Sequence, residues 1–551
     1  MSKFECFDPV SSEELLLIIK SLPNKFSILD PIPNWLLEEC FIELSNVLLY
    51  IVNKSLSEGK FPQILKDAIV YPVVKDSSGD HDNLKNYRPI SNLSVLSKIL
   101  EKVVHSKLNK YLIENNLYCD VQSGYRTGHS CETLLVKMSD DIIKSIDHKN
   151  LVAVVLLDLS AAFDVLDHNL LLGKLKSLYG IDGIALKWFD SFLKNRSFSV
   201  KVNNETSCLG IVIYGVPQGS ILGPLLFILY TKELSDIVAS FGLNLQMYAD
   251  DGSIYVQFNP RDPGNISSTL QNISLCLRQV KKWMLANYLK VNEGKTDFFI
   301  IGHGSTLREY SMKFDIDFCG TKITSKRLSE PGNSDFGKIL GVLLNNDFSM
   351  NRHILNIKKD CYNQLRNLRN IKQYLTTEDK LALIKTLILS KMDFCNALYM
   401  NIPKYQLNIL HKVINVCLRF VYNLGYQENV DEYYLKSHIL PIEYRIKFKV
   451  ILLIHKTLYS KGPKYLEELL NCNTPHWFGS GLGLRSSIDF SLLSVQHNAR
   501  TSNFAKRRFH IHAPVEWNCI PSDIRNCVDC DKFKALLKTF LFQKYEQALS
   551  L

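Results

Sequence analysis

Residues 246–257 read Gln-Met-Tyr-Ala-Asp-Asp-Gly-Ser-Ile-Tyr-Val-Gln, and this stretch decides the fold class. Apolar residues stand on both sides of the central Ala-Asp-Asp-Gly, a pattern that predicts two short strands joined by a tight hairpin. A lone Asp-Asp pair is usually an ordinary solvated turn, but a solvated turn rarely needs such apolar flanks. We therefore expect Asp250 and Asp251 at the tip of a hairpin whose strands are buried.

A second stretch supplies another carboxylate. Residues 151–157 form a continuous apolar run, Leu-Val-Ala-Val-Val-Leu-Leu, which is typical of a buried central strand and ends at Asp158. Unpaired buried carboxylates are costly, so three of them converging would need cations nearby. Hard divalent ions such as Mg²⁺ take oxygen ligands of this kind. Two such ions about 3.5–4 Å apart can clamp the attacking and leaving oxygens of a phosphoryl transfer. The sequence alone leaves open whether the strand and the hairpin meet.

The rest of the chain mixes helical and strand patterns. Helices are expected within 1–54 (with a turn at 26–33) and over 94–111, 167–178, 219–234 (with a Gly-Pro interruption) and 266–284; a strand is expected over 68–74. From about residue 350 the pattern is mostly helical, as in the core of a helix bundle. Residues 471–551 form a distinct tail, loop-like at first, then basic at 506–508, with a helix over 532–544. These patterns together predict an α+β protein.

Composition narrows the class of protein. A chain of 551 residues with 46% hydrophobic and 22% charged residues is long enough for several domains and is globular. A formal net charge of +10 allows binding to a phosphate backbone without demanding it. The start is acidic and no segment approaches the roughly 20 apolar residues that span a bilayer, so we expect an intracellular protein that is neither secreted nor membrane-spanning.

The 14 cysteines are scattered and predict reduced thiols. Cys527 and Cys530 form one C-x-x-C pair with Cys519 nearby, but a zinc site needs four ligands and no second pair stands at ligand spacing. We therefore favour free thiols over a zinc site.

Six short motifs follow one another along the chain. They are Asn86-Tyr87-Arg88-Pro89-Ile90-Ser91, Gln122-Ser123-Gly124-Tyr125-Arg126, Asp158-Leu159-Ser160-Ala161-Ala162-Phe163-Asp164, Gly215-Val216-Pro217-Gln218-Gly219-Ser220, Tyr248-Ala249-Asp250-Asp251 and Asn292-Glu293-Gly294-Lys295-Thr296. In this order and spacing the chain resembles the reverse transcriptases of non-LTR (LINE-type) retrotransposons, most strongly over about 55–305. Residues 513–518, 533–534 and 536–538 resemble the end of jockey-like and chicken-repeat-like elements.

The resemblance implies an α+β right-hand polymerase. Its parts would be an N-terminal helical extension (1–54), fingers and palm with an antiparallel sheet (55–305), a helical thumb and connection (306–470) and a C-terminal module (471–551). The implied activity is RNA-directed DNA polymerisation, in which a primer 3′-hydroxyl attacks a deoxynucleoside triphosphate with the help of two Mg²⁺ ions, which Mn²⁺ can replace. The implied partners are an RNA template and a DNA primer, and integration chemistry implies the nucleus besides the cytoplasm.

The resemblance also assigns residues to the reaction. Asp158, Leu159, Asp250 and Asp251 would form the metal site, and the three aspartates would be catalytic. Lys295 would help to protonate the leaving pyrophosphate.

Other residues would bind the nucleotide and the template–primer duplex. Phe163 would be a steric gate that crowds a ribose 2′-hydroxyl, or else a core residue. Lys75 and Arg88 would contact the triphosphate, or else be solvated surface charges. Gln218, Gly219 and Tyr248 would contact the template and primer, and Gln218 the incoming nucleotide as well.

Glycines and further aspartates surround these residues. Gly215 and Gly219 would allow close approach of the backbone beside Gln218. Asp164 and Asp167 are interpreted as residues at a helix start, where the helix dipole favours acids, and not as metal ligands.

Elements of this family usually encode an endonuclease ahead of the polymerase. The sequence begins too close to the fingers to contain one, and we expect none. Two alternatives stay open. One is a catalytically silent, nucleic-acid-binding relic of such an element, against which the intact aspartates argue. The other is an intron-encoded maturase that binds and folds RNA, against which the jockey-like tail argues.

Overall fold

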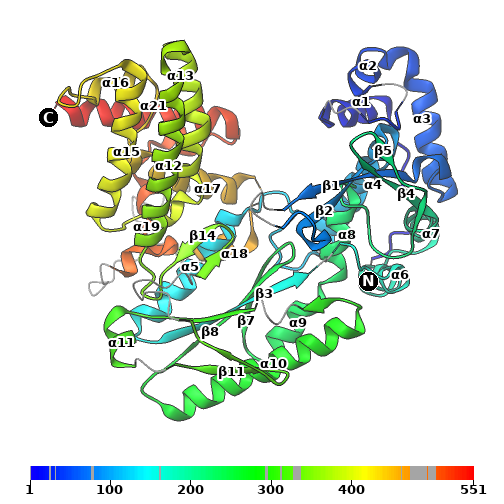
Figure 1. The fold of residues 1–551 in the computed structure, drawn as a ribbon, viewed down its shortest axis with the longest axis horizontal. Coiled ribbons are helices and arrows are strands. Elements are labelled where there is room, and N and C mark those ends of the chain that lie inside the picture. The colour runs from blue at the N-terminus through cyan, green and yellow to red at the C-terminus, as the bar shows by residue number, and fades with distance from the viewer. Residues whose placement is uncertain are drawn as a thin grey trace, which may run out of the picture. The chain divides into compact units, whose positions relative to one another are not determined.

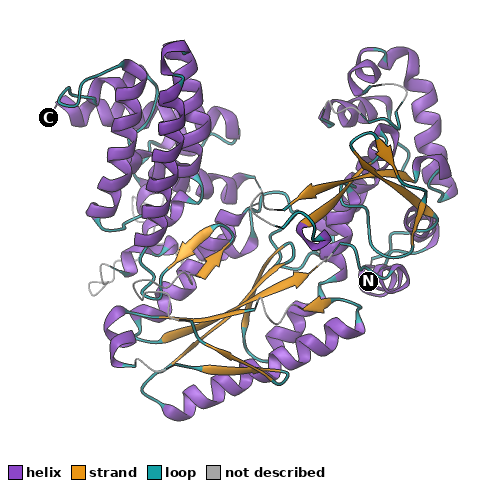
Figure 2. Cartoon of the chain, in the orientation of Figure 1, coloured by secondary structure: helices purple, strands orange, loops and turns teal. Residues whose placement is uncertain are grey.

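The structure is a computed structural model of the chain. It describes residues 2–23, 27–30, 33–75, 80–160, 163–291, 296–310, 313–326, 337–460, 462–471, 493, 495 and 504–550, without the side chains of 158–160, 291 and 471. Helices and strands are mixed throughout, as the α+β prediction requires (Figure 2). The chain forms two compact units: unit 1 comprises Met1–Tyr125, Asp158–Gly242 and Cys276–Gly294, and unit 2 comprises Arg126–Leu157, Leu243–Leu275 and Lys295–Leu551.

Unit 1 contains one sheet of five strands in the order β2-β1-β4-β5, with β6 also pairing with β4 (Figure 1). The strands are β1 (Asp67–Val74), β2 (Tyr87–Asn92), β4 (Arg196–Val202), β5 (Glu205–Thr206) and β6 (Gly210–Val212). β1 is antiparallel to β2, with Val73 opposite Arg88, and parallel to β4. The predicted strand over 68–74 is therefore confirmed.

The helices of unit 1 pack mainly against one another. They are α1 (Ser12–Ser21), α2 (Asn34–Glu39), α3 (Phe41–Glu58), α4 (Val95–Glu114), α6 (His168–Tyr179), α7 (Gly183–Leu193), α8 (Leu222–Tyr230) and α9 (Glu233–Ser240), with 3₁₀ turns η1 (Gln63–Leu65) and η2 (Leu84–Asn86). Local signals fixed several starts. The Ser11 hydroxyl accepts a hydrogen bond from the Glu14 N–H (3.2 Å), and Asp167 accepts one from the Leu170 N–H (2.8 Å).

The single helix expected over 219–234 is wrong, because the chain forms two helices there. α8 starts only at Leu222, where the fully buried Glu101 of α4 accepts hydrogen bonds from the backbone N–H groups of Ile221 (2.7 Å) and Leu222 (3.1 Å). Pro224 falls in the first turn of α8, where a missing N–H costs no helical hydrogen bond. The Gly-Pro pair therefore begins a helix instead of interrupting one.

Unit 2 is built on a sheet in the order β10-β3-β8-β7, and β3 also pairs with β9. The strands are β3 (Leu151–Ser160), which runs on into unit 1, β7 (Asn244–Tyr248), β8 (Asp251–Phe258), β9 (Lys290–Val291, in unit 1) and β10 (Asp297–Ile301). Residues 151–155 of β3 are at most 1% exposed, as the apolar run predicted for a central strand. Two small hairpins follow: β11 (Asp315–Phe318) with β12 (Thr321–Thr324), and β13 (Gly337–Ile339) with β14 (Val342–Leu344).

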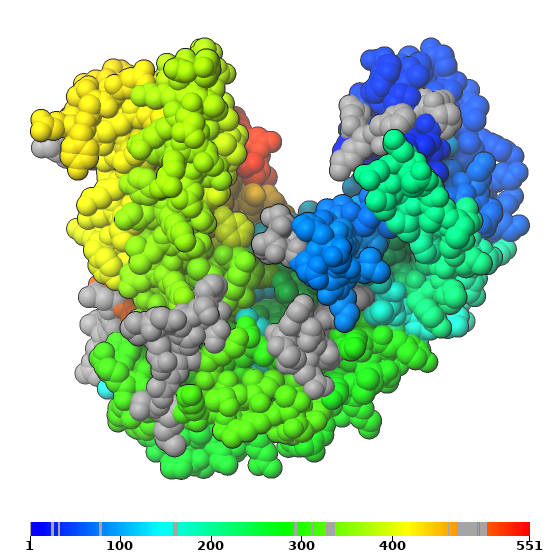
Figure 3. Space-filling view, viewed as in Figure 1, coloured from blue at the N-terminus to red at the C-terminus, as the bar shows by residue number. Residues whose placement is uncertain are grey.

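The remaining helices that lie wholly in unit 2 all contribute residues, except for α11, to one apolar core that also covers one face of this sheet. They are α5 (Cys131–Asp147), α11 (Gly304–Glu309), α12 (Asn351–Asn370), α13 (Thr377–Ile384), α14 (Ser390–Asp393), α15 (Lys404–Tyr422), α16 (Asp431–Lys436), α17 (Ile442–Tyr459), α18 (Lys464–Asn471), α19 (Phe509–Asn518), α20 (Ser522–Arg525) and α21 (Cys530–Ser550), with the short turns η4 (Lys372–Tyr374), η5 (Lys385–Leu389, a π-helix), η6 (Asn396–Tyr399) and η8 (Ala505–Arg507). α10 (Pro263–Ala286) contributes residues to both units. In the space-filling view the yellow-green and yellow helices α12 to α16 form one packed body (Figure 3).

The C-terminal residues of unit 2 are tied to α5 by a buried carboxylate. Asp140 is 1% exposed and accepts hydrogen bonds from Arg508 Nη2 (3.0 Å) and from the backbone N–H of His510 (3.2 Å), with His510 Nδ1 at 2.9 Å. Burial opposes ionisation, but the hydrogen bonds and charges of His510 and Arg508 outweigh it and lower the pKa of Asp140 to about 2. Of the helices that the structure describes, none combines the length and apolar character needed to cross a bilayer.

Candidate active site

The predicted hairpin is present, and its turn has an unusual backbone. Tyr248 of β7 pairs with Asp251 of β8, so Ala249 and Asp250 form a two-residue turn. Ala249 has a φ of 57°, in the left-handed region, which residues with a Cβ adopt at a cost of about 1–2 kcal/mol. Its methyl group is buried, at 7% exposure, while Asp250 is half-buried and Asp251 exposed. The turn therefore presents two adjacent carboxylates at its tip.

The strands behind the turn hold it in place. Met247 on β7 and Ile254 on β8 are buried, as the apolar flanks predicted. On the same strand Tyr255 donates a hydrogen bond to Asp141 Oδ2 of α5 (2.6 Å), which ties the hairpin to that helix. Such anchoring can offset the strain at Ala249, because a conformation of this kind persists only where its surroundings fix it.

The hairpin lies beside the last buried residue of β3 in unit 2. β8 is the neighbour of β3 in the sheet, and a Cβ built on Gly252 would lie 3.6 Å from Leu157 Cβ. Asp158 is the next residue along β3 after Leu157. The side chains of Asp158 and Leu159 fall outside the described residues, and Lys295 falls outside them altogether.

The chemistry of the described donors fits a hard cation. Asp250 and Asp251 offer carboxylate oxygens, the ligands that Mg²⁺ prefers. Across the described part of the chain no three His, Cys, Asp or Glu side chains gather at metal-binding spacing. A complete metal site would therefore need a ligand besides these two, and the predicted one is Asp158.

Phe163, the predicted steric gate, lies in unit 1 among aromatic rings. Its ring centroid is 5.1 Å from that of Phe227 and 6.2 Å from that of Tyr125, which meets it edge-on. The Phe163 carbonyl accepts a hydrogen bond from the Val216 N–H (3.0 Å). The side chain is half-buried, so part of it stays accessible to a ligand while the rings on its sides fix its position.

The loop that carries Gln218 depends on two glycines. Gly215 has a φ of 81°, and a Cβ there would lie 2.7 Å from the Asp164 carbonyl oxygen. Gly219 has a φ of 135°, and a Cβ there would lie 2.3 Å from the Ser91 carbonyl oxygen. The predicted close approach of backbones is thus present on both sides of Gln218, whose own carbonyl accepts a hydrogen bond from the Ser91 N–H (2.7 Å).

The side chain of Gln218 is held by Asp164, a contact that sequence reasoning missed. Gln218 Nε2 donates to Asp164 Oδ1 (2.8 Å) and Oδ2 (2.9 Å). The interpretation of Asp164 as a helix-start residue is wrong, because α6 begins at His168 and Asp167 alone caps it. Desolvation raises the pKa of Asp164, against the opposing effects of the Gln218 hydrogen bond and the charge of Lys75. The only sign of this pairing in the sequence was that Asp164 and Gln218 lie in two consecutive motifs, 158–164 and 215–220.

The remaining predicted residues lie at exposed or half-buried positions. Lys75 directly follows β1 and is exposed, and its Nζ donates to the Lys85 carbonyl (2.7 Å). Arg88 is exposed on β2, Gly219 is exposed in its loop, and Tyr248 is half-buried at the end of β7. The structure thus groups Lys75, Arg88, Phe163, Gln218 and Gly219 in unit 1, and Tyr248, Asp250 and Asp251 in unit 2.

Comparison with known proteins identifies the family. Residues 74–344 match the family described as "Reverse transcriptase (RNA-dependent DNA polymerase)". The chain is 30% identical over 384 residues to "Probable RNA-directed DNA polymerase from transposon BS" of Drosophila melanogaster (68% of this chain, 40% of that protein). It is 25% identical over 393 residues to "RNA-directed DNA polymerase from mobile element jockey" of Drosophila funebris (69% and 40%).

A further relative, "Probable RNA-directed DNA polymerase from transposon X-element" of Drosophila melanogaster, is 25% identical over 354 residues (64% of this chain, 36% of that protein). Residues 74–344 therefore belong to the reverse transcriptase family, and the relatives are RNA-directed DNA polymerases from transposons and from the mobile element jockey, as the order of the motifs predicted. The chain spans about two fifths of the length of these relatives. The expectation that no endonuclease is present stays a prediction.

Proposed function

We propose that the chain is an RNA-directed DNA polymerase that extends a primer 3′-hydroxyl with deoxynucleoside triphosphates. The observation that carries this proposal is the hairpin of β7 and β8. It presents Asp250 and Asp251 on a buried sheet, next to the strand that carries Leu157, within a segment that belongs to the reverse transcriptase family.

The proposed metal site consists of Asp158, Asp250 and Asp251, with Leu159 beside them. Chain continuity supports it, since Asp158 follows Leu157, and Leu157 lies against the hairpin. Two bound Mg²⁺ ions would activate the attacking hydroxyl and stabilise the charge on the leaving pyrophosphate. The three carboxylates would hold the ions and so balance their own charges.

Residues of unit 1 would bind and select the nucleotide. Phe163, fixed between Phe227 and Tyr125, would exclude a 2′-hydroxyl by its bulk. Gln218 would present its amide oxygen, because the acceptor-only carboxylate of Asp164 holds the amide nitrogen. The exposed cations Lys75 and Arg88 would bind triphosphate oxygens.

Three further residues complete the proposed site. Gly219 and Tyr248 would contact the template and primer, and Lys295 would donate a proton to the pyrophosphate.

The proposed architecture is that of a right-hand polymerase. It assigns 1–54 to an N-terminal extension, 55–305 to fingers and palm, 306–470 to the thumb and connection, and 471–551 to a C-terminal module. The five-stranded sheet of unit 1 would belong to the fingers, and the sheet that carries the hairpin to the palm. RNA template, DNA primer and deoxynucleoside triphosphates are the proposed partners.

Primer extension tests the proposal. Purified chain receives a poly(rA) template, an oligo(dT) primer, dTTP and Mg²⁺, beside an Asp250→Ala, Asp251→Ala double variant. We expect extension by the wild type and none by the double variant. Asp236→Ala is the matched control, since Asp236 is an exposed carboxylate of α9, and it should extend like the wild type. No extension by folded wild-type chain that binds the duplex would favour the silent relic.

A further inference from the structure

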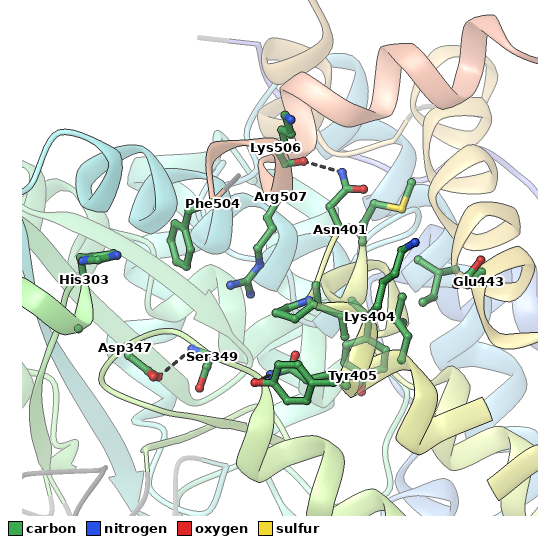
Figure 4. Close-up of a pocket in the computed structure, with 18 of the residues that line it drawn as sticks. His303, Asp347, Ser349, Asn401, Lys404, Tyr405, Glu443, Phe504, Lys506 and Arg507 are labelled. Carbon is green, nitrogen blue, oxygen red and sulfur yellow. Dashed lines mark hydrogen bonds between the residues drawn. The ribbon is translucent and has the colours of Figure 1, made fainter. Parts of the chain in front are cut away.

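Unit 2 contains a cleft that none of the residues proposed for polymerisation lines. Its volume is about 1110 Å³. It lies where α15 begins, and α11, α17 and η8 also contribute to its lining (Figure 4). A cleft of this volume accommodates a ligand of the size of a few nucleotides.

The first turn of α15 supplies the cleft with partial positive charge. α15 has 19 residues and starts at Lys404, after Pro403 at the N-cap position. A proline side chain has no oxygen, and accordingly no side chain caps this end of the helix. Uncapped N–H groups and the helix dipole together favour an anion at such an end.

Three residues that line the cleft also carry buried polar atoms without partners. Tyr399 and Gln406 are 0% and 1% exposed, yet Tyr399 Oη and Gln406 Oε1 have no hydrogen-bond partner among the residues that the structure describes. The same holds for Arg507 Nε. Unpaired polar atoms of this kind are rare inside proteins, and here they belong to residues around one cleft.

Cations outnumber acids on the lining. Arg507 is desolvated between the rings of Phe504 (4.9 Å) and Phe348 (5.7 Å), and burial lowers its pKa to about 10 against the opposing charge of Asp347. Figure 4 shows its guanidinium directed into the space between Asp347 and Lys404.

The exposed side chains Arg308, Lys404 and Lys506 add further positive charge to the lining. Of the acids, Glu516 already forms an ion pair with Lys447 (3.3 Å). The balance left on the lining therefore attracts an anion.

An aromatic ring stands beside these cations. Tyr405 is 56% exposed, and its hydroxyl donates to Asn351 Oδ1 (2.9 Å), which fixes the ring while leaving much of its surface open. Exposed aromatic rings next to Lys and Arg bind single-stranded nucleic acids, because unpaired bases stack on the ring and phosphates meet the cations.

We propose that this cleft binds single-stranded nucleic acid. A phosphate lies at the first turn of α15 with Lys404 and Arg507, and a base stacks on Tyr405. A duplex would not serve, because its bases are already stacked and paired. The site lies outside the polymerisation chemistry and holds a strand before or after it is copied.

The test is binding of a fluorescein-labelled oligouridine octamer containing 4-thiouridine, followed by photocrosslinking and peptide mapping. We expect a crosslink on the peptide that contains Tyr405. Tyr405→Ala should weaken binding at least about fivefold, because the base then has no ring to stack on. Lys404→Ala should also weaken binding, and should make it less dependent on salt, because it removes a contact to a phosphate. Tyr405→Phe keeps the ring and should bind like the wild type. Lys412→Ala removes an exposed lysine of the same helix that does not line the cleft, and it should change nothing.

Two results would overturn the proposal. One is a Tyr405→Ala variant that binds and crosslinks as the wild type does, when a thermal unfolding curve shows that the variant is folded. The other is competition by inorganic phosphate or uridine monophosphate as strong as that of unlabelled octamer, which would leave a site for small anions only. Because neither readout requires primer extension, failure of the polymerase proposal would be seen separately.

Discussion

The β7–β8 hairpin of unit 2 and the loop 215–219 of unit 1 both contain residues with positive φ, but they differ in how the backbone adopts this conformation. The hairpin places Ala249 in the left-handed region and relies on buried strands to keep it there. The loop has Gly215 and Gly219 at these positions, because a Cβ there would lie only 2.7 Å and 2.3 Å from a backbone carbonyl oxygen.

This difference separates two kinds of control. At the hairpin the fold positions the backbone, and the carboxylates at the tip follow. At the loop, side chains position one another: Asp164 holds Gln218, and Tyr125 and Phe227 hold Phe163. We expect changes behind the hairpin to act through the stability of unit 2, and changes at the loop to act on nucleotide use.

The largest expected effect tests whether the stability of unit 2, which holds the hairpin, can be lowered without changing unit 1, which holds the loop. Asp140→Asn removes the charge that pairs with Arg508 and His510, and breaking a buried pair costs about 3–5 kcal/mol. Unit 2 should unfold at lower urea concentration, while the tryptophans of unit 1, Trp35, Trp188 and Trp283, report little change. Asp523→Asn, at an exposed carboxylate of α20, is the control.

The same variant predicts a pH dependence. The folded pKa of Asp140, about 2, lies below the ordinary value of 3.8, so its charge stabilises the fold fully above about pH 4. That contribution is lost as the pH falls from about 4 towards 2. The difference between wild type and Asp140→Asn should therefore shrink over this range in urea unfolding curves. A difference that stays constant down to pH 2 would contradict the assigned pairing.

The next effect concerns the loop itself. Gly219→Ala introduces a Cβ 2.3 Å from the Ser91 carbonyl oxygen, so the loop must move and Gln218 with it. A misplacement of about 1 Å can lower a rate about 100-fold, and we expect a loss of that order in kcat/KM for dTTP. Gly173→Ala, in α6 with nothing within 4 Å, should behave as the wild type. Equal losses in both variants would refute the role of close approach.

A smaller effect tests whether side chains position one another. Asp164→Asn keeps the shape but can donate as well as accept, so the Gln218 amide is no longer fixed in one orientation. We expect the KM for dTTP to rise about tenfold, by the loss of about one charge-assisted hydrogen bond, with little change in thermal unfolding. An unchanged KM would show that the contact does not orient Gln218 for the substrate.

The smallest expected effect comes from placing a glycine in the hairpin turn, which the loop 215–219 already has at its unusual backbone positions. Ala249→Gly relieves the left-handed strain, and the expected stabilisation is about 1 kcal/mol or less, because glycine also gains freedom in the unfolded chain. Unfolding in urea measures it. If the strain only fixes the turn, primer extension should stay within about twofold of wild type. A large loss of activity would show that the methyl group itself supports the carboxylates.

Local patterns in the sequence predicted the elements that carry the chemistry. The apolar run before Asp158 and the apolar flanks of Asp250 and Asp251 gave the central strand and the hairpin, because burial and turn geometry act over a few residues. The helical pattern expected from about residue 350 is likewise present, and in α15 the apolar residues from Leu410 to Val421 are buried.

Contacts between distant residues could not be predicted in this way. Gln218 meets an acceptor 54 positions away, and Arg508 meets Asp140 across 368 positions. The basic run 506–508 resembles a solvated cluster, yet Arg507 is desolvated between two rings. Nothing local distinguishes a half-buried arginine between two rings from an exposed one, since the aromatic partner Phe348 comes from another part of the chain.

The tie between Asp140 and residues 508–510 has a consequence for how the protein is made. α5 leaves the ribosome early, with a carboxylate whose partners are synthesised more than 360 residues later. Until they arrive, α5 cannot bury Asp140 without an uncompensated charge. Unit 2 therefore completes its packing only near the end of translation, and a nascent chain interrupted before residue 508 exposes the surface of α5 to chaperones and proteases.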